Sequence, residues 1–345
     1  MKKLSLLLIG GLAALTAGAQ YPGQQPFMTK TFPRAAVKDL DIRTSGGNIS
    51  VQGEASGDAR VEVFVSSDGR HEPGKEEIRK MLDEQYDLEV GMEGNKLVAI
   101  AKQKAGWQNT WRRGLSISFR VFTPEAVGSH VRTSGGNISM KNLSGSQDFK
   151  TSGGNLDIDH LTGTIVGRTS GGNVSITDSH DDIDLSTSGG NMDAARCEGK
   201  IGLETSGGNV SLRAIKGTIH ARTSGGTVEG GKINGELQAH TSGGNIDLDE
   251  VSASLEASTS GGNIHVDLVS PGKYVDLSNS GGDISLNLPQ GQGIDLRVSG
   301  DRVHTTTMSN FRGDVDEHHI NGTLNGGGIP VKVDGGGGQV HLSFK

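Results

Sequence analysis

The sequence predicts an all-β protein, a single-stranded parallel β-helix (β-solenoid) built from 18-residue coils. The first observation is that the four residues "TSGG" begin at Thr133 and return every 18 residues as far as Thr259. The second is that apolar and polar residues alternate after each copy, as they do in β-strands. The third is that 55 of the 345 residues are glycine and 4% are aromatic. So little aromatic surface excludes an ordinary aromatic-rich core, and the fold must be held together by stacking of repeated units.

Each repeat predicts two short strands and their corners. Counted from the threonine as position 1, apolar residues occupy positions 6 and 8 and then 15 and 17, as in Ile246, Leu248, Leu255 and Ala257. Position 11 adds one more apolar residue. Glycine stands at positions 3 and 4 in every unit and at position 13 in most units, where a corner needs unusual backbone angles or a close backbone approach.

The identity of the corners distinguishes a solenoid from an antiparallel sandwich. In a parallel solenoid each residue lies about 4.8 Å from its counterpart in the next coil, so identical corners stack on identical corners. We therefore interpret "TSGG" as a corner rather than as a ligand-binding loop. Its threonine is predicted to point inward in a ladder of hydroxyls, and the asparagine at position 5 to complete the turn by side-chain to backbone hydrogen bonds. A right-handed helix is expected rather than a left-handed one.

The array does not fill the chain, and the pattern predicts five segments. The first residues combine two lysines, an apolar stretch and the small residues "AGA", which is typical of a secretory signal. An early "TSGG" copy begins at Thr44, and "GKEEIRKMLDEQY" is the one helical candidate. The predicted segments are a signal peptide (1–19), an N-terminal linker (20–36), a strand-rich cap with one early coil (37–131), the regular 18-residue-repeat solenoid (132–298) and C-terminal coils with a cap (299–345).

The signal sequence indicates an exported protein, whose fold has to be stabilised without disulfides. Cys197 is the single cysteine, so no internal disulfide can form, and the net charge of −7 disfavours nucleic acid as a partner. No transmembrane segment is expected in the mature chain, and a monomer is expected. The predicted location is the periplasm, the outer cell surface or the medium.

Three stretches of the chain carry a family resemblance. The "TSGGNI" units, the segment "SISFRVFTPEAVGSHVRTSGGNISM" and the closing "LNGGGIPVKVDGGGGQVHLSF" resemble the putative-adhesin domain family of bacterial envelope proteins, which is largely of unknown function. The resemblance runs from about Val37 to the C-terminus. It implies a β-helical fold and an exported location, and it supplies no catalytic or binding residues.

The distribution of titratable residues favours a non-catalytic protein. Carboxylates are spread along the rows, and position 7 alternates serine with acidic residues, as expected for a solvated face. Asp181 and Asp182 are interpreted as a turn. The late histidines, His304, His318, His319 and His341, predict no metal site, because the adjacent pair would point to opposite faces of a strand. No catalytic residue and no cofactor are predicted. The function expected is an adhesin or scaffold, with a glycan-active β-helical enzyme of the polysaccharide lyase or hydrolase type as the alternative.

The two tryptophans have two possible uses, a docking contact and a glycan site. Trp107 and Trp111 lie in the predicted cap. Docking of their loop onto the first coil accounts for two amphipathic rings, and a glycan site is the alternative.

Calcium is not predicted to be required. The stretch "GGNIDLD" partly matches the calcium-binding nonapeptide G-G-x-G-x-D. The third glycine of that motif is replaced by Ile246, which the alternation assigns to the core.

One outward row could bind a ligand. Arg132, Lys150 and Arg168 occupy position 18 in successive coils, where like charges would stack about 4.8 Å apart. Pairing with Asp148 and Asp184 at position 16 is one explanation. The other is contact with an anionic polymer such as a charged cell-surface polysaccharide, and an envelope protein is a further possible partner.

Overall fold

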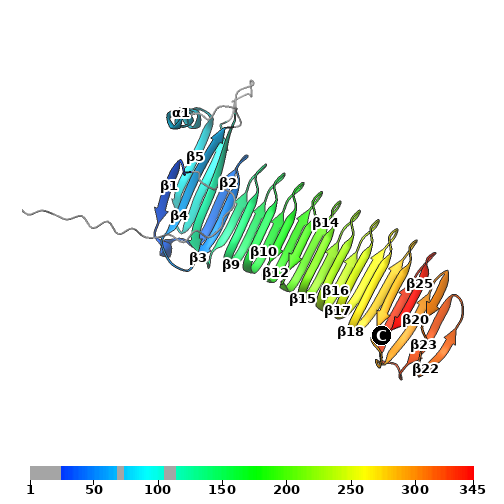
Figure 1. Cartoon of the computed structure of the whole chain (residues 1–345). Coiled ribbons are helices and arrows are strands. Elements are labelled where there is room, and N and C mark those ends of the chain that lie inside the picture. Colours follow the sequence, from blue (N-terminus) through cyan, green and yellow to red (C-terminus); the bar gives the residue numbers. More distant parts are fainter. Residues whose placement is uncertain (1–24, 68–73, 105–113) are drawn as a thin grey trace, which may run out of the picture.

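A computed structural model describes residues 25–67, 74–104 and 114–345. The predicted signal peptide (1–19) and both tryptophans lie outside these residues. The described chain forms a long rod of stacked coils, with a helix at the N-terminal end and a curled hairpin at the C-terminal end (Figure 1). It contains 25 strands, the helix α1 (Lys75–Gln85) and a short 3₁₀ helix, η1 (Arg34–Ala36). The all-β prediction is confirmed, and α1 matches the predicted helical segment.

Ten strands make up the central array, and they pair in parallel. Ile138 is paired with Leu156, and Leu156 with Val174, so each residue lies beside its counterpart one repeat further along the chain. The strands are β9 (Ile138–Lys150), β10 (Leu156–Arg168), β11 (Val174–Thr177), β12 (His180–Thr187), β13 (Met192–Ala195), β14 (Glu198–Thr205), β15 (Val210–Arg222), β16 (Val228–His240), β17 (Ile246–Thr259) and β18 (Ile264–Asn279).

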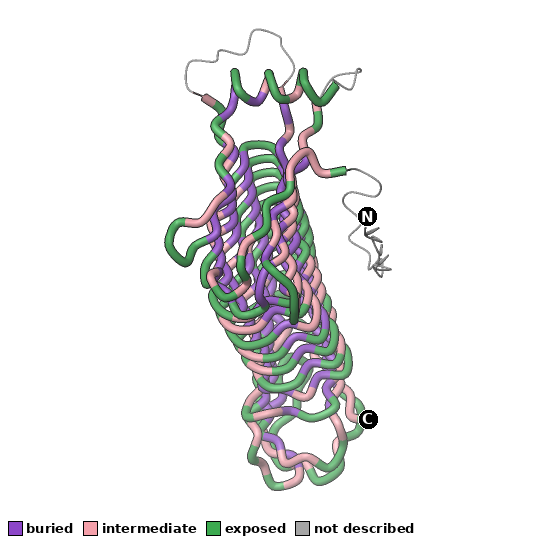
Figure 2. The backbone as a smooth tube through the Cα atoms, turned by 90° about the vertical axis from the view of Figure 1, so that its left-hand side faces the viewer, coloured by how far each residue is buried: buried purple, intermediate pink, exposed green. Residues whose placement is uncertain are grey.

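The interior of the rod is filled by the apolar positions of the repeat. Buried residues line the inside of the tube along its whole length, while exposed residues mark the corners (Figure 2). One repeat illustrates the pattern, with buried side chains at Ile246, Leu248, Val251, Leu255 and Ala257. The alternation predicted from the sequence is therefore confirmed.

Side chains of different size fit together where the array begins. Phe149 is fully buried at position 17, and the next coil carries Gly167 at that position. A Cβ atom on Gly167 would lie 2.4 Å from Cε2 of Phe149 and 2.7 Å from Cδ2 of Leu185. The missing side chain thus leaves the room that two large neighbours need.

The "TSGG" corner joins each coil to the previous one. Thr151 is buried, donates its hydroxyl proton to the carbonyl oxygen of Gly136 at 2.8 Å and accepts from the Gly154 amide at 3.2 Å. A Cβ on Gly154 would lie 1.9 Å from that same carbonyl oxygen, so only glycine fits. The backbone N–H of Asn155 donates a hydrogen bond to the side-chain Oδ1 of Asn137 at 2.8 Å. The threonines point inward as predicted, but each hydroxyl bonds the backbone of the preceding coil rather than another hydroxyl.

The opposite corner uses two residues with positive φ. The glycine at position 13 is one of them, with φ of 128° at Gly217. The residue at position 10 is the other, and there the left-handed conformation is adopted by non-glycine residues: Asn142, His160, Asp178, Arg196, Ala214, Lys232 and Glu250. This second left-handed position is absent from the sequence prediction.

The N-terminal end is an extended sheet built around the early coil. Strands β2 and β3 form that coil and pair in parallel with β8 and β9, so Thr133 bonds the carbonyl oxygen of Gly47 as later threonines bond their own preceding coil. Beyond it lie parallel β6 and β7 and then antiparallel β5, β4 and β1. The strands are β1 (Met28–Phe32), β2 (Asp39–Thr44), β3 (Ile49–Glu54), β4 (Ala59–Ser67), β5 (Tyr86–Glu93), β6 (Lys96–Gln103), β7 (Leu115–Pro124) and β8 (Gly128–Arg132).

At the C-terminal end the order of coils in space departs from their order in the sequence. The last two strands of the chain, β24 and β25, lie against β18 and β19, and the earlier β20 and β21 stack outside them (Figure 1). The hairpin β22–β23 covers this end by antiparallel pairing of β23 with β20. The strands are β19 (Ile284–Leu288), β20 (Ile294–Ser299), β21 (Arg302–Thr305), β22 (Phe311–Val315), β23 (His319–Leu324), β24 (Ile329–Asp334) and β25 (Gln339–Phe344).

Candidate functional site

The three basic residues singled out in the sequence lie in one row. Arg132 is paired with Lys150, and Lys150 with Arg168, across parallel strands. The row begins one coil earlier, because Arg43 of the early coil is paired with Arg132. Sequence reasoning missed Arg43, although it precedes Thr44 as Arg132 precedes Thr133. We call Arg43, Arg132, Lys150 and Arg168 the basic row.

Three members of the basic row are paired with carboxylates of the neighbouring outward row. Arg43 contacts Asp41 at 2.6 Å, Arg168 contacts Asp184 at 3.5 Å, and Arg132 forms a close ion pair with Asp148.

The ion pair with Arg132 also affects the pKa of Asp148. Partial burial acts to raise the pKa of Asp148, but the hydrogen bond and charge of Arg132 outweigh it and, with His130, hold that pKa below its ordinary value. Lys150 is exposed, and among the described residues no carboxylate lies within ion-pair distance of its amine.

The same outward face carries two shallow grooves further along the rod. A groove of about 250 Å³ is lined by His220, Arg222, His240 and Glu256. Burial, and then the nearby charge of Arg222, lowers the pKa of His240.

A second groove, of about 500 Å³, lies near the C-terminal end. Its lining includes Tyr274, Asp276, Asp295, Arg297 and Lys332. Three of its polar groups are engaged already, since Lys332 contacts Asp276 at 3.4 Å and Asp295 accepts a hydrogen bond from the Gly328 amide.

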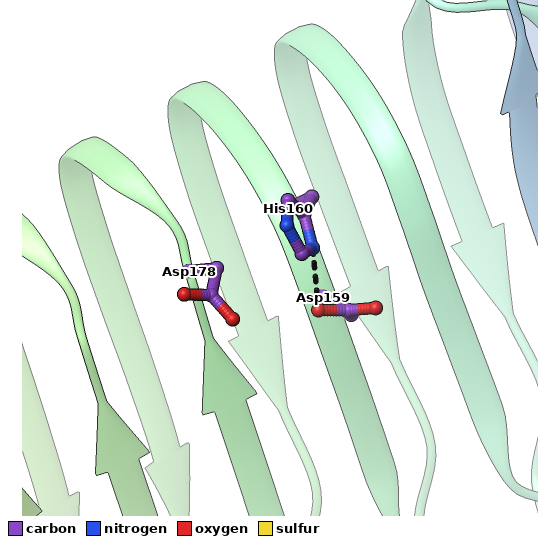
Figure 3. Close-up of side chains that lie close together, drawn as sticks. All are labelled: Asp159, His160 and Asp178. Carbon is purple, nitrogen blue, oxygen red and sulfur yellow. Dashed lines mark hydrogen bonds and ion pairs between the residues drawn. The ribbon is translucent and has the colours of Figure 1, made fainter.

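A corner of the array gathers a second kind of site from two adjacent coils. Asp159, His160 and Asp178 each offer a ligand atom, and these atoms lie within 4.8 Å of one another (Figure 3). Nδ1 of His160 is 2.7 Å from Oδ1 of Asp159, which also accepts a hydrogen bond from the Thr177 hydroxyl at 3.0 Å. Asp178 accepts two hydrogen bonds of 2.7 Å from Arg196. The Arg196 guanidinium holds the pKa of the Asp178 carboxyl below its ordinary value.

The sequence reasoning missed this corner cluster. It considered the histidines at the C-terminal end and overlooked His160. The signal was present, because Asp159 and His160 are adjacent and Asp178 follows one repeat after His160.

The late histidines form two pairs. The rings of His304 and His341 stack with centroids 5.0 Å apart, and those of His318 and His319 meet edge to face at 6.3 Å. His318 contacts the carbonyl oxygen of Asp301 through Nδ1.

The acidic pair in the middle of the array is part of a corner. Asp181 stands at position 13 in place of glycine, with φ of 81°, and accepts a hydrogen bond from the Gly163 amide at 3.0 Å. Its carboxylate thus stabilises the corner backbone, but Asp181 and Asp182 both lie in strand β12, whereas the sequence predicts a turn there.

Comparison with known proteins gives distant structural neighbours. A protein described as a putative cell adhesion protein from Clostridium sporogenes ATCC 15579 is 10% identical, with 92% of this chain and 98% of that chain covered and a TM-score of 0.20. A putative adhesin, BF0245, from Bacteroides fragilis NCTC 9343 is 12% identical, with 92% and 96% covered and a TM-score of 0.23. At these values neither structure constrains the ligand of this chain. No curated protein matches.

In the part of the chain that is described, no helix has the length and apolarity needed to span a bilayer.

The family assignment rests on a match to the repeats and the C-terminal coils. The family model described as Toastrack DUF4097 matches residues 170–343, which is half of the chain and contains most of the array and the C-terminal coils. This match confirms the adhesin-type family resemblance of the sequence, and the protein therefore belongs to the Toastrack DUF4097 family.

Proposed function

We propose that the protein is a non-catalytic, exported envelope protein that presents one face of a right-handed β-solenoid with 18-residue coils as an adhesin or scaffold. Family membership and the rod of stacked coils support an adhesin or scaffold. The ligand class we propose is an anionic polymer such as a charged cell-surface polysaccharide, with an envelope protein as the other candidate partner. The protein acts as a monomer, in the periplasm or outside the cell.

The observation that carries the ligand proposal is the basic row. Four cationic side chains follow one another at about 4.8 Å along a rigid parallel sheet, and this spacing offers repeated contacts to a polymer with repeated negative charges. Lys150, in the middle of the row, has no carboxylate of the described residues within ion-pair distance, which favours such a contact. The arginine pairs do not prevent binding, because ion pairs at the protein surface contribute only about 0–1 kcal/mol and a polymer carboxylate can replace an aspartate.

Ion pairs between adjacent coils indicate that charged residues elsewhere in the array stabilise the fold rather than catalyse a reaction. Asp178 pairs with Arg196 and Glu198 with Lys216, in each case between adjacent coils. Such pairs neutralise charges that stacking brings close together.

A glycan-active enzyme is the alternative, and the groove near Tyr274 favours it. That groove brings an aromatic ring together with Asp276 and Asp295. Both carboxylates already stabilise the local structure, which argues for the binding protein. Release of reducing sugar ends from polysaccharides by the wild-type chain, abolished by Asp295→Asn, would favour the enzyme.

The binding proposal is tested by retention on immobilised polygalacturonate, a uniformly carboxylated glycan. The variant Arg132→Ala, Lys150→Ala, Arg168→Ala should elute at a lower salt concentration than the parent, because fewer cations contact the polymer. Its circular dichroism spectrum should be unchanged.

A control variant that loses the same number of positive charges distinguishes binding by the basic row from a general effect of net charge. Arg213→Ala, Lys216→Ala, Lys232→Ala removes three cations from other rows of the array and should elute like the parent. The ligand proposal is wrong if the parent shows no salt-sensitive retention, or if both triple variants elute together.

The proposed location is tested separately. Fractionation of the producing cells, with protease accessibility measured on intact cells, should place the protein in the envelope or the medium. Recovery in the cytosolic fraction would contradict export.

A further inference from the structure

We propose that Asp159, His160 and Asp178 form a binding site for one divalent transition-metal ion of the Zn²⁺ type on a corner of the solenoid. One nitrogen and two carboxylate groups supply ligand atoms within 4.8 Å of one another. Imidazole and carboxylate are ligands that Zn²⁺ takes, and three protein ligands with solvent in the remaining position is a common arrangement. The sequence pattern predicted no metal site, and this one arises because two coils stack.

The backbone brings these side chains together. His160 and Asp178 hold the same position in adjacent coils, with φ of 54° and 50°, so their side chains leave the corner in corresponding directions. Stacked coils are about 4.8 Å apart, which sets the separation of the two residues. Asp159 closes the group as the last paired residue before the corner, beside Thr177 of the next coil. Figure 3 shows the three side chains on neighbouring turns of the ribbon.

Groups outside the cluster orient both carboxylates. Arg196 donates two hydrogen bonds to Asp178, and the Thr177 hydroxyl donates one to Asp159. Each carboxylate oxygen has more than one acceptor direction, so these bonds leave room for a cation. Hydrogen bonds of this kind are the usual outer support of metal-ligating carboxylates.

The charges and ligand types select the ion. Two carboxylates and one guanidinium leave a net charge of −1 beside the imidazole ring, which a dication can compensate. A cation between the three groups replaces the direct contact of His160 with Asp159. An imidazole ligand disfavours Ca²⁺, which binds through oxygen.

Calorimetric titration of the full chain with ZnCl₂ tests the site. The wild-type chain should bind one Zn²⁺ at this corner. His160→Asn should weaken that binding at least about tenfold, because even supporting residues of metal sites are worth roughly 10- to 100-fold in affinity. The substitution is compatible with the backbone, since Asn142 has φ of 54° at the same position one coil earlier. Asp178→Asn should weaken binding by a similar factor.

The control is His220→Ala, which removes an exposed histidine from the face of the solenoid that carries the basic row, away from the corner cluster. This variant should bind as the wild type does, and Zn²⁺ should raise the melting temperature of both but not that of His160→Asn. The site is ruled out if the wild-type chain binds no Zn²⁺, if His160→Asn binds as tightly as the wild type, or if His220→Ala loses as much affinity as His160→Asn.

Discussion

The two glycines of "TSGG" have different reasons to be glycine. A Cβ on Gly154 would lie 1.9 Å from the Gly136 carbonyl oxygen, whereas a Cβ on Gly153 would come no closer than 3.8 Å to its neighbours. Gly154→Ala should therefore lower the free energy of unfolding by about 1–3 kcal/mol or more, the usual range for overpacking. Gly153→Ala should cost much less. Urea denaturation of both variants measures the difference, and equal losses would contradict the stacking contact.

Glycine at position 13 is required for two reasons: the stacked coil lies too close for a Cβ atom, and the backbone there is left-handed. Gly217 has φ of 128°, and a Cβ there would lie 1.9 Å from the Gly199 carbonyl oxygen. Gly217→Val should cost at least about 1–3 kcal/mol in stability. Gln238→Val, at an outward position, should cost less, because it removes a half-exposed side chain and its contact to His220. The comparison is made by denaturant midpoint, and similar midpoints would show that the inward and outward positions are wrongly assigned.

The side of the strand that a side chain faces was predictable from the sequence wherever the repeat has a strict alternation. Strict alternation placed Ile246 and Leu248 in the core because successive strand residues face opposite sides. The left-handed position 10 was not predictable, because Arg196 and Lys232 adopt it there and neither has a left-handed preference. The 18-residue period already sets His160 beside Asp178, but the left-handed backbone from which both side chains leave the corner was not predictable, so their approach to Asp159 was missed.

Ion pairs between adjacent coils make the array sensitive to acid. The hydrogen bond from Arg196 lowers the pKa of Asp178 from its ordinary 3.8, and that from Lys216 lowers the pKa of Glu198 from 4.5. A carboxyl with a lowered pKa in the folded state stabilises the fold above its unfolded pKa, and this contribution is lost as the pH falls through the folded pKa. Stability should therefore fall as the pH drops below 4.5 and then 3.8.

Arg196→Ala isolates one of these pairs. Without the guanidinium, the pKa of Asp178 returns toward its ordinary value, and the denaturant midpoint should fall less steeply between about pH 5 and pH 3. Ala214 already occupies the same left-handed position, so the backbone tolerates alanine. Lys232→Ala, also at position 10, is the control and should keep the slope of the parent. An unchanged slope in Arg196→Ala would exclude the Asp178 pair as a source of acid sensitivity.

The order of coils at the ends was less predictable than the strands themselves. The sequence gives no local signal that β24 inserts between β18 and β20, because the paired residues Asp276 and Lys332 are far apart in the chain. The antiparallel pairing of β4 with β7 likewise joins segments that are separated in the chain by α1, β5 and β6. Period and alternation define strands inside the array, whereas pairing across long separations depends on packing of the whole end.

The rod as a whole should fold without calcium. Ile246 is fully buried at the place where a calcium-binding nonapeptide would need glycine, and the Thr241 hydroxyl closes the corner through backbone hydrogen bonds. The melting temperature of chelator-treated protein should stay the same, within error, when CaCl₂ is added. A collapse of the melting temperature in chelator, restored by calcium, would overturn this expectation.

The contact of Phe149 with Gly167 has a consequence for how the rod assembles. Near-identical coils can pair out of order, because a shift by one whole repeat still sets threonine against threonine and glycine against glycine. If β10 were left out of the stack, Phe149 would be paired directly with Leu185 instead of with Gly167, which has no side chain. Two large side chains would then compete for the volume of one. The mismatched arrangement is strained while the correct one is not, so this pair of unequal residues selects the right neighbour for β9 among coils that otherwise look alike.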